Sequence, residues 1–362
     1  MEFYSFFLKS YAKNAILRVK ISRKAVNTMH KIKIAQIGTS RYSHGTSVWK
    51  SLQKQSDIFE VIGYAFPENE REKFPEQAKT FDGYREMTID EILNDPEIEA
   101  VAVETEEIYL TKYALMVAKA GKHLHMEKPG GVALADFKQL IDTLKEKNLA
   151  FSTGYMYRFN PAVQKAVEKA RSGALGKIYA VEAHMSCYHT DDIRAWLENF
   201  PCGMMFFLGC HLIDIIYRIQ GEPQEIIPLT CSTERGGIGT CDYGMTVFKY
   251  PNGVSFAKTC DIERGGFLRR QLVICGEKGT IEIRPLEISA PEGGQCAVSH
   301  DCYGTRWAEP WETKRSEAFD RYDGMMKNFA EIVRGKENSY SYEYEYKLYQ
   351  LLLQSCGKDI SK

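Results

Sequence analysis

Residues 121–131 read GKHLHMEKPGG, and the rest of the chain is organised around this segment. A helical pattern ends at Gly121, a short apolar run follows, and Glu127, Lys128 and Pro129 come directly after that run. In an open α/β sheet the carboxyl ends of the strands form the ligand crevice. Lys128, beside a proline that restricts the backbone, is therefore predicted to lie at a ligand site. An isolated Glu-Lys-Pro triplet is more often a surface turn, so this prediction depends on the surrounding segments.

Strand and helix patterns alternate on both sides of this segment, from residue 31 to residue 153. The apolar strand patterns are residues 32–37, 59–66, 98–105, 124–127 and 150–153. Between them lie segments with apolar residues three and four apart, which is typical of helices. Thr88 and Glu91 form a capping box, and Gly121 is a helix stop. This alternation predicts right-handed βαβ units and a doubly wound parallel sheet of the Rossmann kind.

The pattern changes after residue 153. Asn160 and Pro161 begin a helix, a strand pattern covers residues 178–185, and a long helical stretch is predicted over residues 204–219. Period-two segments joined by turn residues follow, at 225–231, 243–250, 254–262, 270–275 and 280–283. Such segments predict a largely antiparallel sheet, and helices over about 318–333 and 344–353 end the chain. The predicted fold class is α/β, with a Rossmann sheet followed by an α+β domain that contains a large open, mostly antiparallel sheet.

A chain of 362 residues is long enough for two domains. The patterns divide it into a dinucleotide-binding domain, residues 29–153, and a substrate and oligomerisation domain, residues 154–362. Residues 1–28 carry six Lys or Arg against one Glu and are predicted to be an extension outside the fold.

The composition is typical of a soluble globular protein, with 44% hydrophobic residues, 26% charged residues and a net charge of −1. This balance disfavours nucleic acid or an anionic membrane as the main partner. No run approaches the roughly 18 apolar residues that a bilayer span requires. The ten cysteines follow no metal or disulfide spacing. We therefore expect no metal site, reduced thiols and a cytoplasmic location.

The first turn of the Rossmann half departs from the usual dinucleotide pattern. The fingerprint G-x-G-x-x-G would place glycines at 38, 40 and 43, but the chain has Gly38, Ser40 and Ser43. With Thr39, these small residues still allow a pyrophosphate to approach the backbone at a helix N-terminus. The second strand ends without the acidic residue that binds ribose hydroxyls, and Glu68 offers a carboxylate only further on. The choice between NAD and NADP stays open.

Five motifs along the chain occur together in one known family. They are Gly121-Lys122-His123 leading to Glu127-Lys128-Pro129, Arg158 with Asn160-Pro161, Gly173-x-x-Gly176-Lys177-Ile178, the run LGCHLID at residues 208–214, and Gly276-x-x-Gly279-Thr280. In this order they resemble the Gfo/Idh/MocA oxidoreductases, the group of glucose–fructose oxidoreductase and inositol dehydrogenase, over about residues 30–355. The resemblance implies NAD or NADP bound between two domains and a sugar, polyol or keto-sugar substrate. It also implies a homo-oligomer, a dimer or tetramer, assembled through the C-terminal sheet.

The resemblance further implies roles for individual residues. Lys128 matches the family's catalytic lysine and His211 its catalytic histidine. A desolvated lysine beside a positive nicotinamide is expected to have its pKa lowered towards about 7–8, which suits proton transfer. His211 would share or relay that proton. The expected cofactor-binding residues are Gly38, Thr39, Ser40, Ser43, Thr105, Glu127 and Lys128, and the expected substrate residues are Tyr157, Arg158 and Asp214.

Two departures from the family pattern leave alternatives open. Phe207 stands four residues before the histidine, where the family has an aspartate, and Thr105-Glu106-Glu107 replaces the family's Thr-Pro. One alternative is an NAD-dependent lyase or glycosidase that uses transient oxidation. Another is a non-catalytic sugar- or nucleotide-sensing protein on the same scaffold. Retention of Lys128 and His211 favours a dehydrogenase or reductase that acts on CH–OH groups.

Two further segments carry polar or aromatic residues. His184, His189, Asp191 and Asp192 have no metal-ligand spacing and are expected to be solvated loop residues. Residues 301–311 are expected to form a long aromatic loop, as a lid or an oligomer contact.

Overall fold

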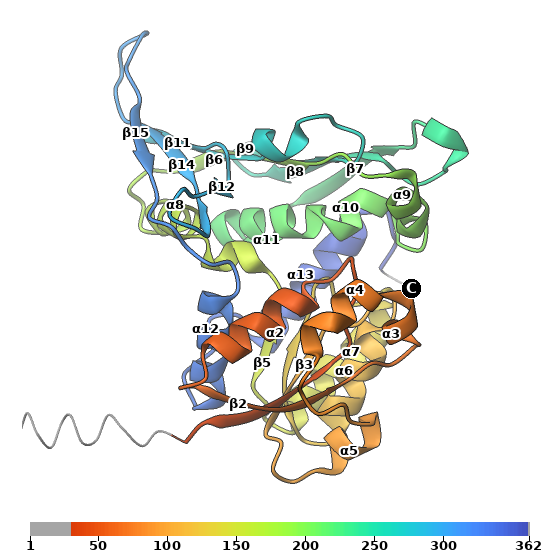
Figure 1. Cartoon of the computed structure of the whole chain (residues 1–362). Coiled ribbons are helices and arrows are strands. Elements are labelled where there is room, and N and C mark those ends of the chain that lie inside the picture. The colour runs from red at the N-terminus through yellow and green to blue at the C-terminus, as the bar shows by residue number, and fades with distance from the viewer. Residues whose placement is uncertain (1–29, 361–362) are drawn as a thin grey trace, which may run out of the picture.

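The computed structural model describes residues 30–360, which form two sheet-containing domains stacked on one another (Figure 1). The predicted extension, residues 1–28, lies outside the described residues. Among residues 30–360, no helix combines the length and the apolar composition that a bilayer crossing requires.

The N-terminal sheet is parallel throughout and has the order β2-β1-β3-β4-β5. Its strands are β1 (Ile32–Ile37), β2 (Phe59–Ala65), β3 (Ala100–Val103), β4 (His123–Met126) and β5 (Phe151–Thr153). Strand β3 reads AVAV and is buried along its whole length, as expected where helices cover both faces of a parallel sheet. The strand order reverses between β1 and β3, so the ligand crevice opens at their carboxyl ends. The predicted doubly wound sheet is confirmed.

Helices connect these strands. The longer ones are α2 (Gly45–Lys54), α6 (Leu110–Lys119) and α7 (Leu134–Glu146), and the shorter ones are α3 (Glu70–Lys73), α4 (Pro75–Ala78) and α5 (Ile89–Asn94). The predicted capping box begins α5. Thr88 Oγ1 accepts the backbone N–H of Glu91 at 3.1 Å, and the Glu91 carboxylate accepts the N–H of Thr88 at 2.7 Å.

The C-terminal sheet has eight strands in the order β15-β14-β11-β10-β6-β9-β8-β7. Its strands are β6 (Ile178–Ser186), β7 (Glu225–Cys231), β8 (Tyr243–Tyr250), β9 (Gly253–Cys260), β10 (Gln271–Gly276), β11 (Gly279–Ile283), β14 (Val298–Cys302) and β15 (Glu312–Arg315). Neighbours are antiparallel except β6 and β9, which confirms the mostly antiparallel prediction. A minor pair, β12 (Ile288–Ser289) and β13 (Gln295–Cys296), lies apart from it. Helices α8 (Pro161–Arg171), α10 (Gly203–Phe207) and α11 (Gly209–Gln220) lie between this sheet and the Rossmann domain (Figure 1).

The helical stretch predicted over residues 204–219 is present but is divided into α10 and α11. Leu208 interrupts it with φ −109° and ψ −35°, and α11 begins at Gly209. A Cβ added to Gly209 would lie 2.5 Å from the thioether sulfur of Met205, so glycine lets α11 begin close to this side chain. The break releases the carbonyl of Phe207 from regular helix bonding, and this carbonyl faces the site described below.

The predicted aromatic loop is present over residues 303–311, which form neither helix nor strand, and it joins two strands into a hairpin. Strands β14 and β15 pair in antiparallel register from Val298 with Arg315 to Asp301 with Glu312. The hairpin projects from the C-terminal domain (Figure 1), and Trp307 near its tip is fully exposed. The sequence did not predict these two strands. They are short and mostly polar, so they lack the alternation of apolar residues that marks a strand.

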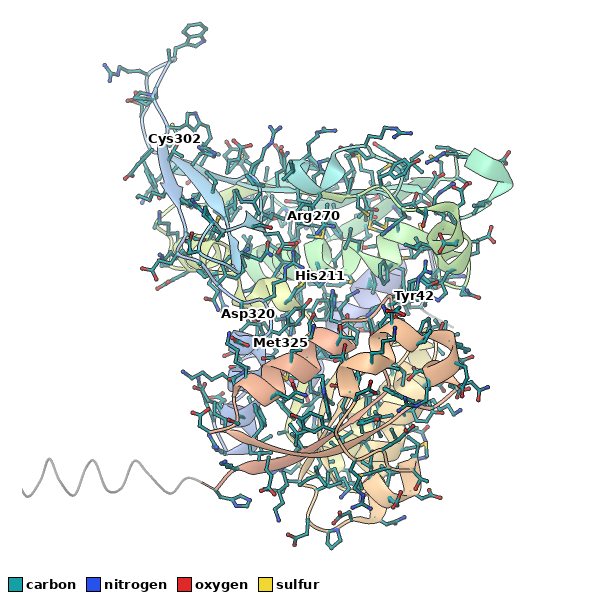
Figure 2. The ribbon with its side chains drawn as sticks, in the orientation of Figure 1. Tyr42, His211, Arg270, Cys302, Asp320 and Met325 are labelled. Carbon is teal, nitrogen blue, oxygen red and sulfur yellow. The ribbon has the colours of Figure 1, made fainter. Side chains whose placement is uncertain are left out.

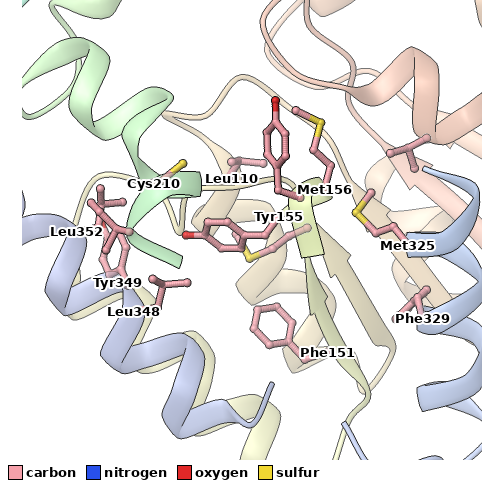
Figure 3. Close-up of a cluster of buried hydrophobic side chains, with 14 of the residues drawn as sticks. Leu110, Phe151, Tyr155, Met156, Cys210, Met325, Phe329, Leu348, Tyr349 and Leu352 are labelled. Atoms are coloured by element: carbon pink, nitrogen blue, oxygen red, sulfur yellow. The ribbon is translucent and has the colours of Figure 1, made fainter. Parts of the chain in front are cut away.

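The last two helices, α12 (Asp323–Val333) and α13 (Tyr342–Ser355), pack back against the Rossmann domain. Helix α12 lies on α2, and α13 lies on both α7 and α11. Figure 3 shows Leu348 and Leu352 of α13 facing Cys210 of α11, with Phe329 of α12 on the opposite side of β5. The two domains therefore share one apolar core behind the interdomain site.

Candidate active site

A cavity of about 250 Å³ lies between the two domains and contains both predicted catalytic residues. Lys128 reaches it from the end of β4, and His211 reaches it from the first turn of α11. Figure 2 shows His211 at the seam between the domains and Tyr42 of the Rossmann first turn further along it. The structure thus brings together two residues that are 83 positions apart in the sequence.

The Lys128 side chain is 1% exposed and is held from two sides. Its Nζ donates to the carbonyl of Phe207 at 3.1 Å and lies 3.5 Å from Glu127 Oε1. The ammonium also sits 4.2 Å from the centre of the Phe207 ring, within cation–π distance. Phe207, which replaces an acidic residue of the family pattern, therefore contacts the lysine through both its carbonyl and its ring.

Among the protein's own groups the Lys128 pKa is raised, and the lowering expected beside a positive nicotinamide stays a prediction. Burial acts to lower the pKa, but the nearby Glu127 carboxylate and the charges of other acidic neighbours outweigh it, so the pKa lies above its usual value. This effect depends on the 3.5 Å approach of Glu127 Oε1 to Lys128 Nζ, which the sequence does not show. Lys128 is an ammonium donor at neutral pH rather than a free amine.

The pKa of His211 is shifted in the opposite direction to that of Lys128. It is 1% exposed, and neither ring nitrogen has a hydrogen-bond partner within the described part of the chain. Burial and the nearby positive charge of Lys128 lower its pKa well below the usual value, so the imidazole is neutral. Tyr155 and Tyr157 meet its ring edge-on, with centroids 5.8 and 5.2 Å away. A neutral imidazole with an unpartnered nitrogen can accept a hydrogen bond from a ligand hydroxyl.

The predicted cofactor turn is occupied by side chains of the protein itself. The carboxylate of Glu70 accepts the backbone N–H of Thr39 at 3.0 Å and that of Glu106 at 3.3 Å. Ser40 Oγ accepts the backbone N–H groups of Tyr42 at 2.8 Å and Ser43 at 3.2 Å. These amides are the type of donor that a pyrophosphate would use.

Other features of the crevice fit a dinucleotide. Gly38 has φ +89°, and a Cβ there would lie 2.5 Å from Thr105 Cγ2, so the turn is closely apposed to the end of β3. The buried Thr39 hydroxyl and Glu127 Oε2 have no partner among the described residues. Helix α2 begins without a side-chain cap. The residues of this turn therefore fit a dinucleotide, provided that the hydrogen bond from the Thr39 amide to Glu70 breaks.

Buried carboxylates accumulate at the end of β3 and β4. Glu104 and Glu107 are fully buried, and their oxygens have no hydrogen-bond partner within residues 30–360. Burial raises the pKa of Glu107 to about 8 and that of Glu104 well above its usual range. Burial would also raise the pKa of Glu127, but His44 and Lys128 outweigh it and hold that pKa below its usual value. Glu127 is therefore the charged carboxylate that keeps Lys128 protonated.

The three expected substrate residues do not line the cavity. Arg158 is buried and donates to Asp214 at 2.9 Å and to Glu345 of α13 at 2.6 Å. Tyr157 is also buried and donates to Glu287 at 2.7 Å. Asp214 lies on α11 as predicted, but its carboxylate faces Arg158 and the Tyr344 hydroxyl instead of a ligand.

Several residues of the site were not singled out from the sequence. His189 was expected to be a solvated loop residue, but it lines the cavity, and burial lowers its pKa to about 4. His184, expected in the same class, is buried on β6 beside Glu263. Arg270 and Arg321 also line the cavity. No local motif marks these residues, because strands and loops distant in sequence bring them here. Within the described chain, no three metal-ligating side chains are grouped as a metal site.

Family models match both domains. Residues 32–155 match the model described as "Oxidoreductase family, NAD-binding Rossmann fold", and residues 163–282 match the GFO/IDH/MocA C-terminal domain. The chain therefore belongs to the Gfo/Idh/MocA oxidoreductase family, which confirms the resemblance and the dinucleotide-binding type of its first domain.

Individual relatives are more distant. An uncharacterized oxidoreductase of Escherichia coli, YhhX, is 33% identical over 142 residues, covering 38% of this chain and 40% of the relative. Levoglucosan dehydrogenase of Pseudarthrobacter phenanthrenivorans is 34% identical over 173 residues, covering 46% of this chain and 43% of the relative. The matched regions thus span less than half of either relative. A solved structure of levoglucosan dehydrogenase with NADH and levoglucosan aligns with a TM-score of 0.75 at 18% identity, covering 92% of this chain and all of that one. At this identity the likeness concerns the fold.

Proposed function

We propose that the protein is an NAD(P)-dependent oxidoreductase that transfers hydride between a nicotinamide cofactor and a sugar, polyol or keto-sugar. The observation that carries this proposal is the pairing of a charged Lys128 with a neutral His211 in one buried cavity. Lys128 can donate a proton to a carbonyl oxygen and take it back from the resulting hydroxyl, and His211 can accept a hydrogen bond from that hydroxyl, which suits interconversion of a carbonyl and an alcohol. The levoglucosan dehydrogenase relative supports a sugar as the substrate class.

When bound, the nicotinamide supplies or accepts the hydride. In the reducing direction the Lys128 ammonium donates a hydrogen bond, and then a proton, to the carbonyl oxygen that becomes a hydroxyl. In the oxidising direction the same path runs in reverse, so Lys128 as the free amine takes back the hydroxyl proton, and the neutral His211 accepts a hydrogen bond from that hydroxyl. Glu127 keeps Lys128 charged and Phe207 covers it, so developing negative charge on the substrate oxygen is stabilised away from water. A protonated Lys128 suits the proton donation that reduction of a carbonyl needs.

The cofactor would lie along the ends of β1, β3 and β4. The residues proposed to hold it are Gly38, Thr39, Ser40, Ser43, Thr105, Glu127 and Lys128, to which the structure adds Glu70 as a carboxylate beside the turn. The Glu70 carboxylate lies between the ends of β1 and β3. This position suits a contact with ribose hydroxyls once Glu70 releases the Thr39 amide. The titrations with NADH and NADPH described below distinguish NAD from NADP as the cofactor.

The expected assembly and location are also part of the proposal. The outer face of the C-terminal sheet exposes apolar side chains, including Tyr179, Leu229 and Val254, at 44%, 54% and 51%. Exposed apolar groups on one sheet face support a homo-oligomer, a dimer or tetramer, through that sheet. The protein is expected to act in the cytoplasm.

Cofactor binding tests the proposal directly. The purified protein is titrated with NADH and with NADPH, followed by cofactor fluorescence and thermal shift. Saturable binding of one cofactor, then oxidation of that cofactor with keto-sugars or reduction of its oxidised form with sugars and polyols, is the expected result. Lack of binding of all four cofactor forms at millimolar concentration would overturn the proposal.

One observation favours a second candidate, a non-catalytic sugar- or nucleotide-sensing protein. The turn amides of Thr39, Tyr42 and Ser43 are already satisfied by Glu70 and Ser40. If these hydrogen bonds persist when a ligand is present, the turn is closed to a dinucleotide, and the protein would bind a sugar or nucleotide without one. Ligand-induced thermal stabilisation that survives Lys128→Ala, with no turnover by the parent protein, would support this candidate.

A further inference from the structure

We propose that the molecule taken up by the interdomain cavity is a small sugar that carries an anionic group, held by the guanidinium groups of Arg270 and Arg321. The inference rests on the proposed function, since it names the substrate class of the same site. Figure 2 shows Arg270 close to His211 on the C-terminal side of the seam. Arg270 precedes β10 and Arg321 precedes α12, so two distant segments contribute to one cationic wall.

The lining of the cavity is strongly biased in charge. Its cationic residues are Arg41, Lys128, Arg270 and Arg321, whereas no aspartate or glutamate lines it. The net charge of the whole chain is −1, so this bias is local. A cavity wall of one sign attracts a ligand of the opposite sign.

The carboxylates behind this wall do not cancel its charge. Lys128 pairs with Glu127, and the exposed Arg41 pairs with Asp192. Arg270 and Arg321 share the single carboxylate of Glu287, at 3.4 and 2.7 Å. Four cations against three carboxylates leave one positive charge. The nearby Glu104 and Glu107 add little negative charge near neutral pH because burial raises the pKa of both.

Arg270 is suited to receive an anion. It is 7% exposed, and its hydrogen bonds to Tyr157, Glu287 and the carbonyl of Ser186 are all 3.3–3.4 Å long. These distances are longer than the 2.7–2.9 Å of strong charge-assisted hydrogen bonds. The planar guanidinium fork matches a carboxylate or phosphate in a bidentate manner. A ligand anion could therefore form shorter hydrogen bonds with the Arg270 guanidinium than the protein groups around it do.

The size and the remaining walls limit the ligand. At about 250 Å³ the cavity lies below the roughly 300–1,000 Å³ of pockets for drug-sized ligands. It suits a monosaccharide rather than a nucleotide sugar. Phe207 and Phe267 line the cavity and offer apolar surface to the CH groups of a sugar ring. A sugar acid or its keto derivative, or a sugar phosphate, combines these properties.

A matched ligand series tests this inference. D-glucuronate, D-glucose 6-phosphate, D-glucose and methyl D-glucuronate ester are titrated into wild-type protein saturated with the cofactor that it prefers, followed by thermal shift and tryptophan fluorescence. Both anionic compounds, or one of them, should bind at least tenfold more tightly than the neutral pair, and salt should weaken that binding. A preference for the uronate or for the phosphate identifies the anion. Equal affinity for neutral and anionic sugars would overturn the inference.

Variants assign the effect to the arginines. Arg321→Gln, whose side chain is 23% exposed, should lose the anionic preference and keep its cofactor affinity, whereas Arg306→Gln on the exposed hairpin should behave as wild type. Arg321→Lys keeps the charge without the fork and should recover only part of the affinity. An unchanged preference in Arg321→Gln and Arg270→Gln would also refute the assignment. If no cofactor binds, the proposed enzyme activity fails, and the same series is run on the protein alone. Anion binding in that experiment would still support the arginine site.

Discussion

Glu70 Oε2 accepts the backbone N–H of Thr39 at 3.0 Å, which places a buried carboxylate on the first turn of the Rossmann fold. Its other oxygen accepts the N–H of Glu106, and the Glu106 carboxylate pairs with Lys73 at 3.1 Å. Burial raises the pKa of Glu70 to about 8. A carboxyl group with this pKa changes its charge within the working range of pH, and both stability and cofactor binding should respond.

Stability should fall as pH rises through the range in which Glu70 ionises. The carboxyl pKa is about 8 in the folded protein against 4.5 ordinarily, so the folded state holds the proton more tightly. Its contribution to stability is full below about pH 4.5 and is lost as pH rises to about 8. Glu70→Gln should therefore show a shallower decline in urea denaturation midpoint between about pH 5 and pH 8. Glu76→Gln, at an exposed side chain, is the control and should keep the wild-type slope.

Cofactor affinity should also depend on the charge of Glu70. A pyrophosphate near Thr39 is repelled by the ionised carboxylate but not by the protonated form. NADH or NADPH affinity should thus be constant below about pH 8 and fall up to about tenfold per pH unit above it. Fluorescence titrations between pH 6.5 and 9.5 measure this. Identical pH profiles for the wild type and Glu70→Gln would show that Glu70 does not control the turn.

Lys128→Met should abolish most of the turnover. Loss of a positioned proton donor costs about 10²–10⁴-fold in rate. Because the pKa of Lys128 is raised, kcat/KM for reduction of a keto-sugar by the wild type should show no fall from lysine ionisation up to about pH 9.5. Steady-state kinetics across this range provide the test. A wild-type rate that falls with an apparent pKa of about 7–8, as the sequence predicted, would contradict the charged resting state.

Arg158→Met should destabilise the protein strongly. Arg158, Asp214 and Glu345 are 3%, 1% and 3% exposed, and removal of the arginine leaves two buried carboxylates without their cation. Breaking such a network costs about 3–5 kcal/mol. Chemical denaturation measures the loss, with Arg306→Met, at an 84% exposed side chain, expected within about 0.5 kcal/mol of wild type. A loss below about 1 kcal/mol for Arg158→Met would show that the buried triad contributes little to stability.

The elements with strong local signals were predictable from the sequence. The strand patterns around 32–37 and 98–105, the Thr88 capping box and the turn at Asn160-Pro161 appear in the structure with small shifts of their ends. These signals depend on neighbours within a few residues, which the sequence displays directly. The break at Leu208 and the strands of the β14–β15 hairpin were not predictable, because they depend on packing against Met205 and on pairing across the sheet.

The sequence by itself determined the fold class, the family and the pair Lys128 and His211, since apolar periodicity and motif order are properties of the chain alone. Only the tertiary structure decided the protonation of that pair, because Glu127 and burial act through space on both groups. It also moved Arg158 and Asp214 out of the cavity into a buried ion-pair network and brought Arg270 and Arg321 into it. Charges separated by more than a hundred residues interact at contact distance only after folding, and their energies depend on distance and on desolvation.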